Sequence, residues 1–290
     1  MKIIDSIIPG KQFISLEFFP PKERHDWPSF FQTVDKLKQL DPLFASVTYG
    51  AGGSTHSSTL EIVSRLQQDY GLEAMAHLTC IGAEEAEVLK FMHELAKVGV
   101  NNVLALRGDP PQDVAAGSVT SSTLKHATDL VAFLRGHHPE FGLAVAGYPE
   151  THPEAIDAKS DLDFLKAKFE NGGDFAITQL FFDNQHYFDF ISHARAVGVT
   201  KPIIPGILPV VNLKVIKRIM SLCGASLPAE YLAQLEDADS RGGAAEVQKL
   251  GVAYARKQAE GLLAGGAPGV HLYTLNRVDA VQQIAEGLLK

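Results

Sequence analysis

The most constraining feature of this sequence is an apolar run of strand length that recurs eight times along the chain. The runs are FISLEFF at 13–19, FASVTYG at 44–50, EAMAHLTC at 73–80, NVLALRGD at 102–109, GLAVAGYP at 142–149, FAITQLFF at 175–182, PIIPGILP at 202–209 and GVHLYTLN at 269–276. Most of them are continuously apolar rather than alternating, which is typical of strands covered on both faces. Segments of helical period separate them, and this alternation predicts a parallel sheet. Because eight strands favour closure, we predict an α/β fold, the (β/α)8 TIM barrel.

The segments between the runs carry apolar residues at three-to-four spacing, which is typical of helices packed on a sheet. We predict helices over 27–40, 55–70, 83–98, 122–135, 157–171, 185–197 and 213–222. Residues 223–268 are longer than one crossover helix requires. Pro228 marks a helix start there, and glycine pairs at 242–243 and 265–266 mark breaks. We therefore predict two or three extra helices between strands seven and eight.

Composition limits the remaining possibilities. With 290 residues and 46% hydrophobic content, the chain can bury one large core, and we predict a single domain over residues 1–290. A net charge of −8 argues against a nucleic-acid partner, which would require a basic surface. No run of about 18 apolar residues is present, so we predict no membrane span, and Asp5 and Pro9 interrupt any secretory signal. Cys80 and Cys223 lie in unrelated contexts, which suits a cytoplasmic protein, and we predict no metal site.

Glu17 is the one carboxylate within the first apolar run, FISLEFFPP. Pro20 and Pro21 lack the backbone donor that a central strand needs, so they place Glu17 near the carboxyl end of its strand. Among Phe18 and Phe19 the side chain loses hydration, which is expected to raise its pKa and to suit a general acid at neutral pH. The alternative interpretation is a structural ion pair with an Arg or Lys, since such pairs perturb carboxylates as well.

Polar residues gather at the carboxyl ends of the predicted strands, where barrel enzymes carry their active sites. They are Glu17, Thr48, Tyr49, His77, Thr79, Arg107, Asp109, Tyr148, Glu150, His152, Gln179, Asp183, Tyr273, Asn276 and Arg277. Singly, each has a structural explanation, such as rim packing for a tyrosine or a structural pair between Arg107 and Asp109. Together on one rim, they favour an enzyme over a scaffold.

Two loops at this rim have features of ligand-binding loops. The LRGDPP segment at 106–111 places a charged pair directly after a strand, and its two prolines stiffen the turn. The GGST stretch at 52–55 opens a helix, whose backbone donors suit a phosphate. Neither loop matches the G-x-G-x-x-G dinucleotide fingerprint or a Walker motif.

Eight motifs, in this order and at these spacings, resemble methylenetetrahydrofolate reductase of the bacterial type. They are EFFPP, SVTYGAGG, AHLTC, LRGDPP, YPETHPEA, ITQLFFD, IIPGILP and YTLNR, and they extend from about Phe13 to Arg277. The resemblance implies a (β/α)8 flavoprotein that uses NADH or NADPH to reduce 5,10-methylenetetrahydrofolate to 5-methyltetrahydrofolate through bound FAD. It further implies a homo-oligomer that serves one-carbon metabolism and methionine supply.

The resemblance also implies roles for individual residues. Glu17 matches the general acid that protonates the folate's bridging nitrogen, and Asp109 matches a catalytic carboxylate between flavin and folate. The FAD-binding positions are Tyr49, Ala51, His77, Arg107, Gly108, Asp109, His126, Ala127, Tyr148, His152, Ala155, Asp161 and Lys168. The folate or nicotinamide contacts are Thr48, Asp109, Gln179 and Arg277.

Four residues depart from the bacterial pattern. His126 stands where the pattern has Tyr, which changes the kind of flavin contact. Phe164 and Ala167 replace polar residues near the FAD phosphates, which shifts anchoring onto Lys168. Leu213 replaces a Phe that stacks on substrate, at a cost of about 0.5–1.5 kcal/mol if nothing compensates.

Other functions remain open from the sequence. A pterin-binding barrel methyltransferase would share the fold and the folate but would need no flavin. A non-enzymatic ligand-binding barrel gives no reason for the place of Glu17, and a metal-dependent aldolase would need clustered ligands. No second nucleotide motif is found, so we expect one face to serve both substrates in turn, with ping-pong kinetics. The chain ends soon after the last strand, so we expect no C-terminal regulatory domain and no inhibition by S-adenosylmethionine through one.

Overall fold

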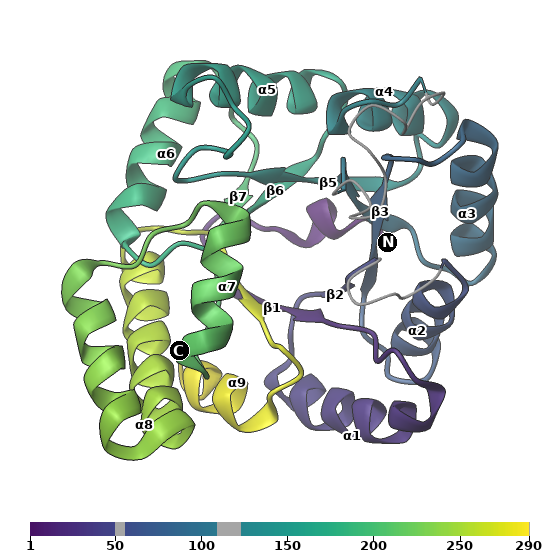
Figure 1. Ribbon diagram of the computed structural model, residues 1–290. Helices are drawn as coiled ribbons and strands as arrows, with labels where there is room; N and C mark the ends of the chain where they lie inside the picture. Colours follow the sequence, from purple (N-terminus) through teal and green to yellow (C-terminus); the bar gives the residue numbers. More distant parts are fainter. Residues whose placement is uncertain (50–55, 109–122, 290) are drawn as a thin grey trace.

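A computed structural model describes residues 1–49, 56–108 and 123–289 of the chain (Figure 1). Its strands are β1 (Phe13–Phe18), β2 (Ala45–Val47), β3 (Ala74–Thr79), β4 (Asn102–Leu106), β5 (Gly142–Gly147), β6 (Phe175–Thr178), β7 (Ile203–Ile204), β8 (Gly206–Ile207) and β9 (Gly269–Tyr273). They pair in parallel in the order β7-β6-β5-β4-β3-β2-β1-β9-β8. Each predicted strand is present within these residues, and each is shorter than its apolar run.

The predicted seventh strand is divided into β7 and β8 by Pro205, which has no amide hydrogen for a ladder. Strand β7 pairs with β6 and β8 pairs with β9, so the two halves bring the edges of the sheet together. Gly206 makes this close passage possible. A Cβ there would lie 2.5 Å from the Thr178 carbonyl oxygen and 2.7 Å from the Tyr273 side chain. The (β/α)8 barrel prediction is confirmed, with its seventh strand interrupted.

Helices surround the sheet (Figure 1). They are α1 (Trp27–Leu37), α2 (His56–Gln68), α3 (Glu85–Lys97), α4 (Ala127–His137), α5 (Ala158–Glu170), α6 (Asn184–Ala196), α7 (Leu213–Cys223), α8 (Ala229–Ala264) and α9 (Val278–Ala285). Helix α3 shows why these segments are helical. Glu84 and Glu87 form a capping box at its start, and Val88, Met92 and Leu95 form its buried stripe.

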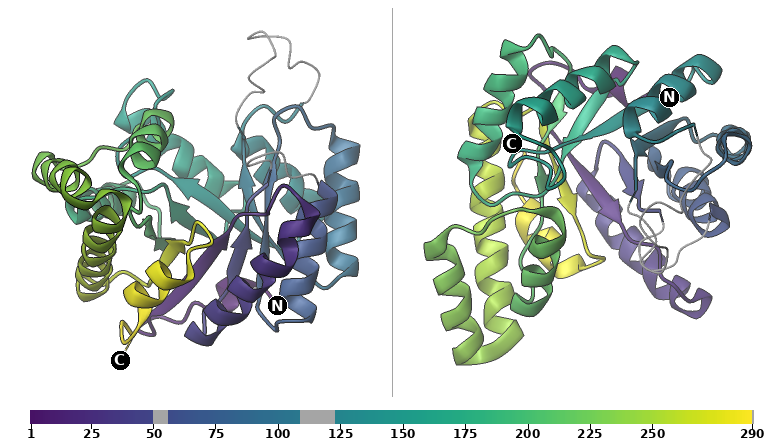
Figure 2. Two further views of the ribbon diagram at one scale, coloured as in Figure 1. Left: turned by 60° about the horizontal axis from the view of Figure 1, so that its bottom comes forward. Right: turned by 45° about the horizontal axis from the view of Figure 1, so that its top comes forward.

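The predicted extra helices between strands seven and eight are present as α8, which follows Pro228 and kinks at Gly242 and Gly243. Figure 2 shows α7 and α8 together at one side of the barrel. Helix α4 begins later than the predicted residue 122. The Asp129 carboxylate accepts hydrogen bonds from the backbone amides of Lys125 and His126, and this fixes the start at Ala127.

The core has an inner and an outer part. Apolar side chains such as Phe44, Met75 and Phe175 fill the inside of the barrel, where Ile3 of the short helix η1 (Ile3–Ser6) joins them. A larger cluster lies between the strands and the surrounding helices. The apolar end of the barrel is therefore filled, and the opposite end, where the strands finish, carries the polar residues. Among the described helices, none is long and apolar enough to cross a membrane.

Candidate active site

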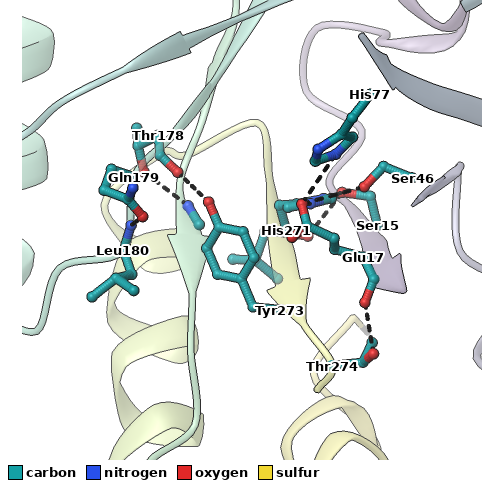
Figure 3. Close-up of polar contacts among 12 residues, drawn as sticks. Ser15, Glu17, Ser46, His77, Thr178, Gln179, Leu180, His271, Tyr273 and Thr274 are labelled. Carbon is teal, nitrogen blue, oxygen red and sulfur yellow. Dashed lines mark hydrogen bonds and ion pairs between the residues drawn. The ribbon is translucent and has the colours of Figure 1, made fainter. Parts of the chain in front are cut away.

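Glu17 lies inside the barrel at the carboxyl end of β1, between two histidines (Figure 3). Its Oε2 is 3.3 Å from Nε2 of His77 on β3 and 3.4 Å from Nε2 of His271 on β9. Ser46 on β2 donates a 3.5 Å hydrogen bond to the same oxygen. Only 5% of Glu17 is exposed, so these three neighbouring side chains take the place of water around its carboxylate.

The pKa of Glu17 does not follow the prediction from its apolar neighbours in sequence. Burial raises it, but the charge of His77 and a hydrogen bond from His271 outweigh burial and lower the pKa from the ordinary 4.5 to about 2. The predicted upward shift is therefore wrong. The alternative prediction, an ion pair with Arg or Lys, also names the wrong partners, because the groups beside the carboxylate are imidazoles from other strands.

His271 connects Glu17 to a further hydroxyl. Its Nδ1 lies 2.8 Å from the Ser15 Oγ, while its Nε2 faces Glu17. The ring has no exposed surface and stacks on Phe44 with centroids 5.7 Å apart. Because packing fixes the ring and both nitrogens have partners, His271 is suited to hold a proton at either nitrogen.

Sequence reasoning missed His271, Ser15 and Ser46. Ser15 and Glu17 are two residues apart on β1 and so share one face, as do His271 and Tyr273 on β9. This alternation could have indicated Ser15 and His271, because each lies two residues before a residue already predicted at the rim, Glu17 and Tyr273. Without the strand register, nothing in the sequence indicates that β1 and β9 are neighbours.

Tyr273 of β9 connects this cluster to β6, on another part of the barrel mouth. Tyr273 donates a 2.6 Å hydrogen bond to the carbonyl of Thr178, and Gln179 follows directly on β6 (Figure 3). The Gln179 amide oxygen accepts a bond from the backbone amide of Leu180. Gln179 and Tyr148 line the same small hollow at the rim. Among the described residues, no acceptor is found for the nitrogen of the Gln179 side chain.

Predicted flavin positions on β5, its following loop and α5 are connected by hydrogen bonds. Lys168 on α5 donates to the carbonyl of Ala146 at 2.9 Å, and Asp161 accepts from the backbone amide of His152 at 2.9 Å. The rings of Tyr148 and His152 meet edge to face at 4.6 Å. Burial lowers the pKa of Lys168 to about 8, against the opposing influence of Asp161. This amine is poorly hydrated, so an anionic ligand would stabilise its charged form.

Arg107 and Gly108 follow β4 at the same rim. Arg107 makes a bidentate ion pair with Glu154 of the loop after β5, its Nη2 lying 2.9 Å from Oε1. Gly108 has φ +84°, and a Cβ there would lie 2.9 Å from Thr79 and Ile81. Asp109, the partner that the sequence suggests for Arg107, lies outside the described residues.

The remaining predicted positions divide into four groups. Thr48 and Tyr49 follow β2, and Thr48 is 6% exposed. His126 precedes α4 and stacks loosely on Phe164, with ring centroids 6.5 Å apart, so these two departures from the bacterial pattern contact each other. Ala51, Asp109 and the GGST stretch at 52–55 lie outside the described residues. Ala127, Ala155 and Arg277 lie at helix or loop starts on the same rim.

Comparison with known proteins identifies the family. The family model for methylenetetrahydrofolate reductase matches residues 2–288. The 5,10-methylenetetrahydrofolate reductase of Escherichia coli (strain K12) is 36% identical over 282 residues, which cover 97% of this chain and 92% of that protein. The chain belongs to the methylenetetrahydrofolate reductase family.

Other relatives of the reductase family are longer. Methylenetetrahydrofolate reductase (NADH) 1 of Arabidopsis thaliana is 38% identical over 303 residues, and the chain spans 50% of its length. A solved structure with a TM-score of 0.65 is an uncharacterized protein from Clostridium thermocellum that binds two copies of 5-methyl-5,6,7,8-tetrahydrofolic acid. It is 14% identical and covers 97% of this chain and 94% of its own, which shows a shared fold.

Membership of the reductase family confirms the resemblance drawn from the eight motifs. The extent of the domain and the roles of individual residues stay predictions. The described residues contain no cluster of His, Cys, Asp or Glu suited to a metal ion. In this chain, the buried carboxylate of Glu17 lies between two imidazoles at the mouth of the barrel.

Proposed function

We propose that this protein reduces 5,10-methylenetetrahydrofolate to 5-methyltetrahydrofolate with NADH or NADPH, using bound FAD. The observation that supports this most is the carboxylate of Glu17, held between His77 and His271 at the barrel mouth of a methylenetetrahydrofolate reductase family member. A reductive ring opening of the folate needs a proton at nitrogen and a hydride at carbon. The Glu17 cluster is suited to deliver the proton.

The rim is compatible with a flavin dinucleotide. Lys168 offers a poorly hydrated amine for a phosphate. At Gly108 only the backbone fits, because a Cβ there would collide with Thr79. Within the described part of the chain, the buried Thr48 Oγ1 has no hydrogen-bond partner, an arrangement that a ligand would relieve. FAD would be held by Tyr49, Ala51, His77, Arg107, Gly108, Asp109, His126, Ala127, Tyr148, His152, Ala155, Asp161 and Lys168. When bound, it stores the hydride between the two substrates.

The folate and the nicotinamide would share the space over the barrel mouth. Thr48 and Gln179 offer uncharged hydrogen-bonding groups on opposite sides of it, with Asp109 as a further contact. Arg277 is exposed at the start of α9, where its fixed positive charge can meet the anionic part of the folate. One site used in turn by both substrates requires ping-pong kinetics.

The low pKa of Glu17 determines how the proton arrives. The carboxylate is ionised at neutral pH, so it cannot carry a resident proton to the substrate. Both imidazoles place Nε2 beside Oε2, and we propose that a proton reaches Glu17 through one of these two rings. Glu17 accepts it at Oε2 and passes it to the folate nitrogen. Ser15 at the other nitrogen of His271 fixes the orientation of that ring.

The test begins with the absorbance spectrum of the purified protein. A yellow protein that bleaches with NADH or NADPH under anaerobic conditions, and then forms 5-methyltetrahydrofolate identified by mass spectrometry, supports the proposal. Comparing the two nicotinamide donors sets the preference. A colourless protein that transfers a methyl group from a folate would refute it in favour of a pterin-binding methyltransferase.

We further propose that the protein acts in the cytoplasm as a homo-oligomer, as the resemblance implies. Light scattering after size exclusion tests the second point. A mass equal to that of one chain, 31.4 kDa, at all concentrations would contradict it.

A further inference from the structure

The segment that follows β9 makes a tight turn in an uncommon conformation. The backbone amide of Arg277 donates to the carbonyl of Thr274 at 2.8 Å, and the two residues between them both have positive φ, 45° for Leu275 and 56° for Asn276. This pair of angles is typical of type I′ turns, in which Asn and Gly are common. A leucine there is strained, because its Cβ crowds the backbone. Such strain persists only where surrounding contacts enforce it.

Asn276 supplies one of these contacts by binding the backbone of β1's end with both halves of its amide. Its Oδ1 accepts from the Phe19 amide at 3.1 Å, and its Nδ2 donates to the Phe19 carbonyl at 2.8 Å. The ladder between β1 and β9 ends at the pair of Glu17 and Tyr273. The Asn276 side chain thus continues the pairing after the strands themselves have finished.

Thr274 supplies a second contact, directly on Glu17. Its Oγ1 donates to the Glu17 carbonyl at 2.6 Å, and its backbone amide donates to the same oxygen at 3.2 Å (Figure 3). The Thr274 Oγ1 also accepts from the Asn276 amide at 3.0 Å. Thr274 and Asn276, named the clasp here, therefore hold the backbone on both sides of Phe18.

The side chain of Leu275 lies outside the clasp. It packs against the apolar cluster of α7 and α8 and lines a hollow with Leu208 and Ile216. Strain at Leu275 is thus offset by apolar contact on one side and by the clasp on the other. The turn is fixed from two directions, and Arg277 directly follows it.

We propose that Asn276 and Thr274 are positioning residues that set the place of Glu17 relative to Arg277. The inference rests on the proposed function, in which Glu17 delivers a proton to the folate and Arg277 binds the same molecule. The clasp links Glu17 to Arg277 through the four residues 274–277 that follow β9. It therefore keeps the acid at a fixed position relative to the bound substrate. Loss of the clasp should impair the folate half-reaction and spare flavin binding and flavin reduction.

Asn276→Gly is the sharpest variant, because glycine accepts the left-handed backbone and the substitution removes the side chain that binds Phe19. Asn101→Gly, on the loop before β4 at the opposite end of the barrel, is the matched control. In single-turnover measurements at saturating folate we expect Asn276→Gly to slow flavin reoxidation by about 100-fold, a loss typical of misplaced reacting groups. Flavin content and the rate of reduction by NAD(P)H should match those of the control.

A pair of variants at Thr274 separates positioning from general destabilisation. Thr274→Val keeps the shape and removes the hydroxyl, so it should slow the same step. Thr274→Ser restores the donor and should recover the rate. An Asn276→Gly enzyme with normal folate reoxidation, or one that loses flavin and both half-reactions together, would overturn the proposal.

Hydrogen exchange provides a readout that does not depend on the reaction. The Phe19 amide donates a hydrogen bond to the Asn276 Oδ1. Its hydrogen should exchange faster in Asn276→Gly than in the unchanged protein, while the amides of β3 keep their exchange rates. Equal protection of Phe19 in both proteins would refute the clasp even if the chain reduces no folate. Faster exchange in a protein without reductase activity would instead refute only the proposed function.

Discussion

Replacing Glu17 by Gln removes the one charge around which the barrel mouth is arranged. The amide keeps the size of the side chain and can still accept one hydrogen bond, from His77 or His271. It cannot accept and release a proton. In the folate half-reaction, loss of general acid catalysis typically lowers the rate by about 10²–10⁴-fold. Reduction of the flavin by NAD(P)H needs no proton from Glu17 and should be unchanged.

The same variant has a second consequence, for stability. Moving the pKa of Glu17 from 4.5 to about 2 corresponds to about 3 kcal/mol of interaction in the folded state. Because the folded pKa is the lower one, this contribution is present above about pH 4.5 and is lost as the pH falls towards 2. Glu17→Gln should therefore be less stable than the unchanged protein at neutral pH, by up to about 3 kcal/mol. The difference in stability between the two proteins should become smaller as the pH falls towards 2.

Stopped-flow spectroscopy under anaerobic conditions measures the two half-reactions separately, and urea unfolding at neutral and acid pH measures stability. Glu61→Gln is the matched control, because Glu61 forms a largely exposed pair with Arg24 that should contribute little. Folate reoxidation of the reduced Glu17→Gln enzyme at the unchanged rate would refute Glu17 as the acid. A stability gap that widens in acid would refute the lowered pKa.

Three further predictions follow from the rim. The charge of Lys168 disappears as the pH rises through about 8, so FAD affinity measured by fluorescence should fall over that pH range and should be low in Lys168→Met. The half-exposed control Lys166→Met should keep its affinity, and an affinity that does not change with pH would contradict the prediction. Gly108→Ala should lower stability by about 1–3 kcal/mol through its positive φ and its 2.9 Å approach to Thr79, whereas Gly136→Ala in α4, with open space around it, should be neutral or stabilising in thermal unfolding. Gln179→Ala should weaken both half-reactions with parallel double-reciprocal lines, and damage to the folate half alone would indicate separate sites.

Much of the fold could be predicted because the strands are continuous apolar runs, and the period of such runs is local information. The division of the seventh strand was harder to foresee. PIIPGILP reads as one run, and only the packing of Gly206 against Thr178 and Tyr273 shows why the chain is interrupted there. The start of α4 was also misplaced, since the cap made by Asp129 is a single hydrogen-bonding choice among several polar residues.

The sequence indicated Glu17 and His77 as candidate site residues, but it did not indicate His271 or the direction of the pKa shift of Glu17. Glu17 stood out because a carboxylate is unusual in an apolar strand. Its pKa depends on His77 and His271, which are 60 and 254 positions away in sequence and adjacent only after the barrel closes. The pairing of Arg107 with Glu154 was missed for the same reason, because β4 and β5 must be neighbours before the two side chains can meet.

The central claim is that one flavin-bearing site receives hydride from NAD(P)H and gives it to the folate in a separate step. The most direct test reduces the protein with NADH or NADPH, removes all nicotinamide by anaerobic gel filtration, and then adds 5,10-methylenetetrahydrofolate. One 5-methyltetrahydrofolate should form per bound flavin, together with return of the oxidised flavin spectrum. Failure of the nicotinamide-free reduced protein to form any 5-methyltetrahydrofolate would contradict it.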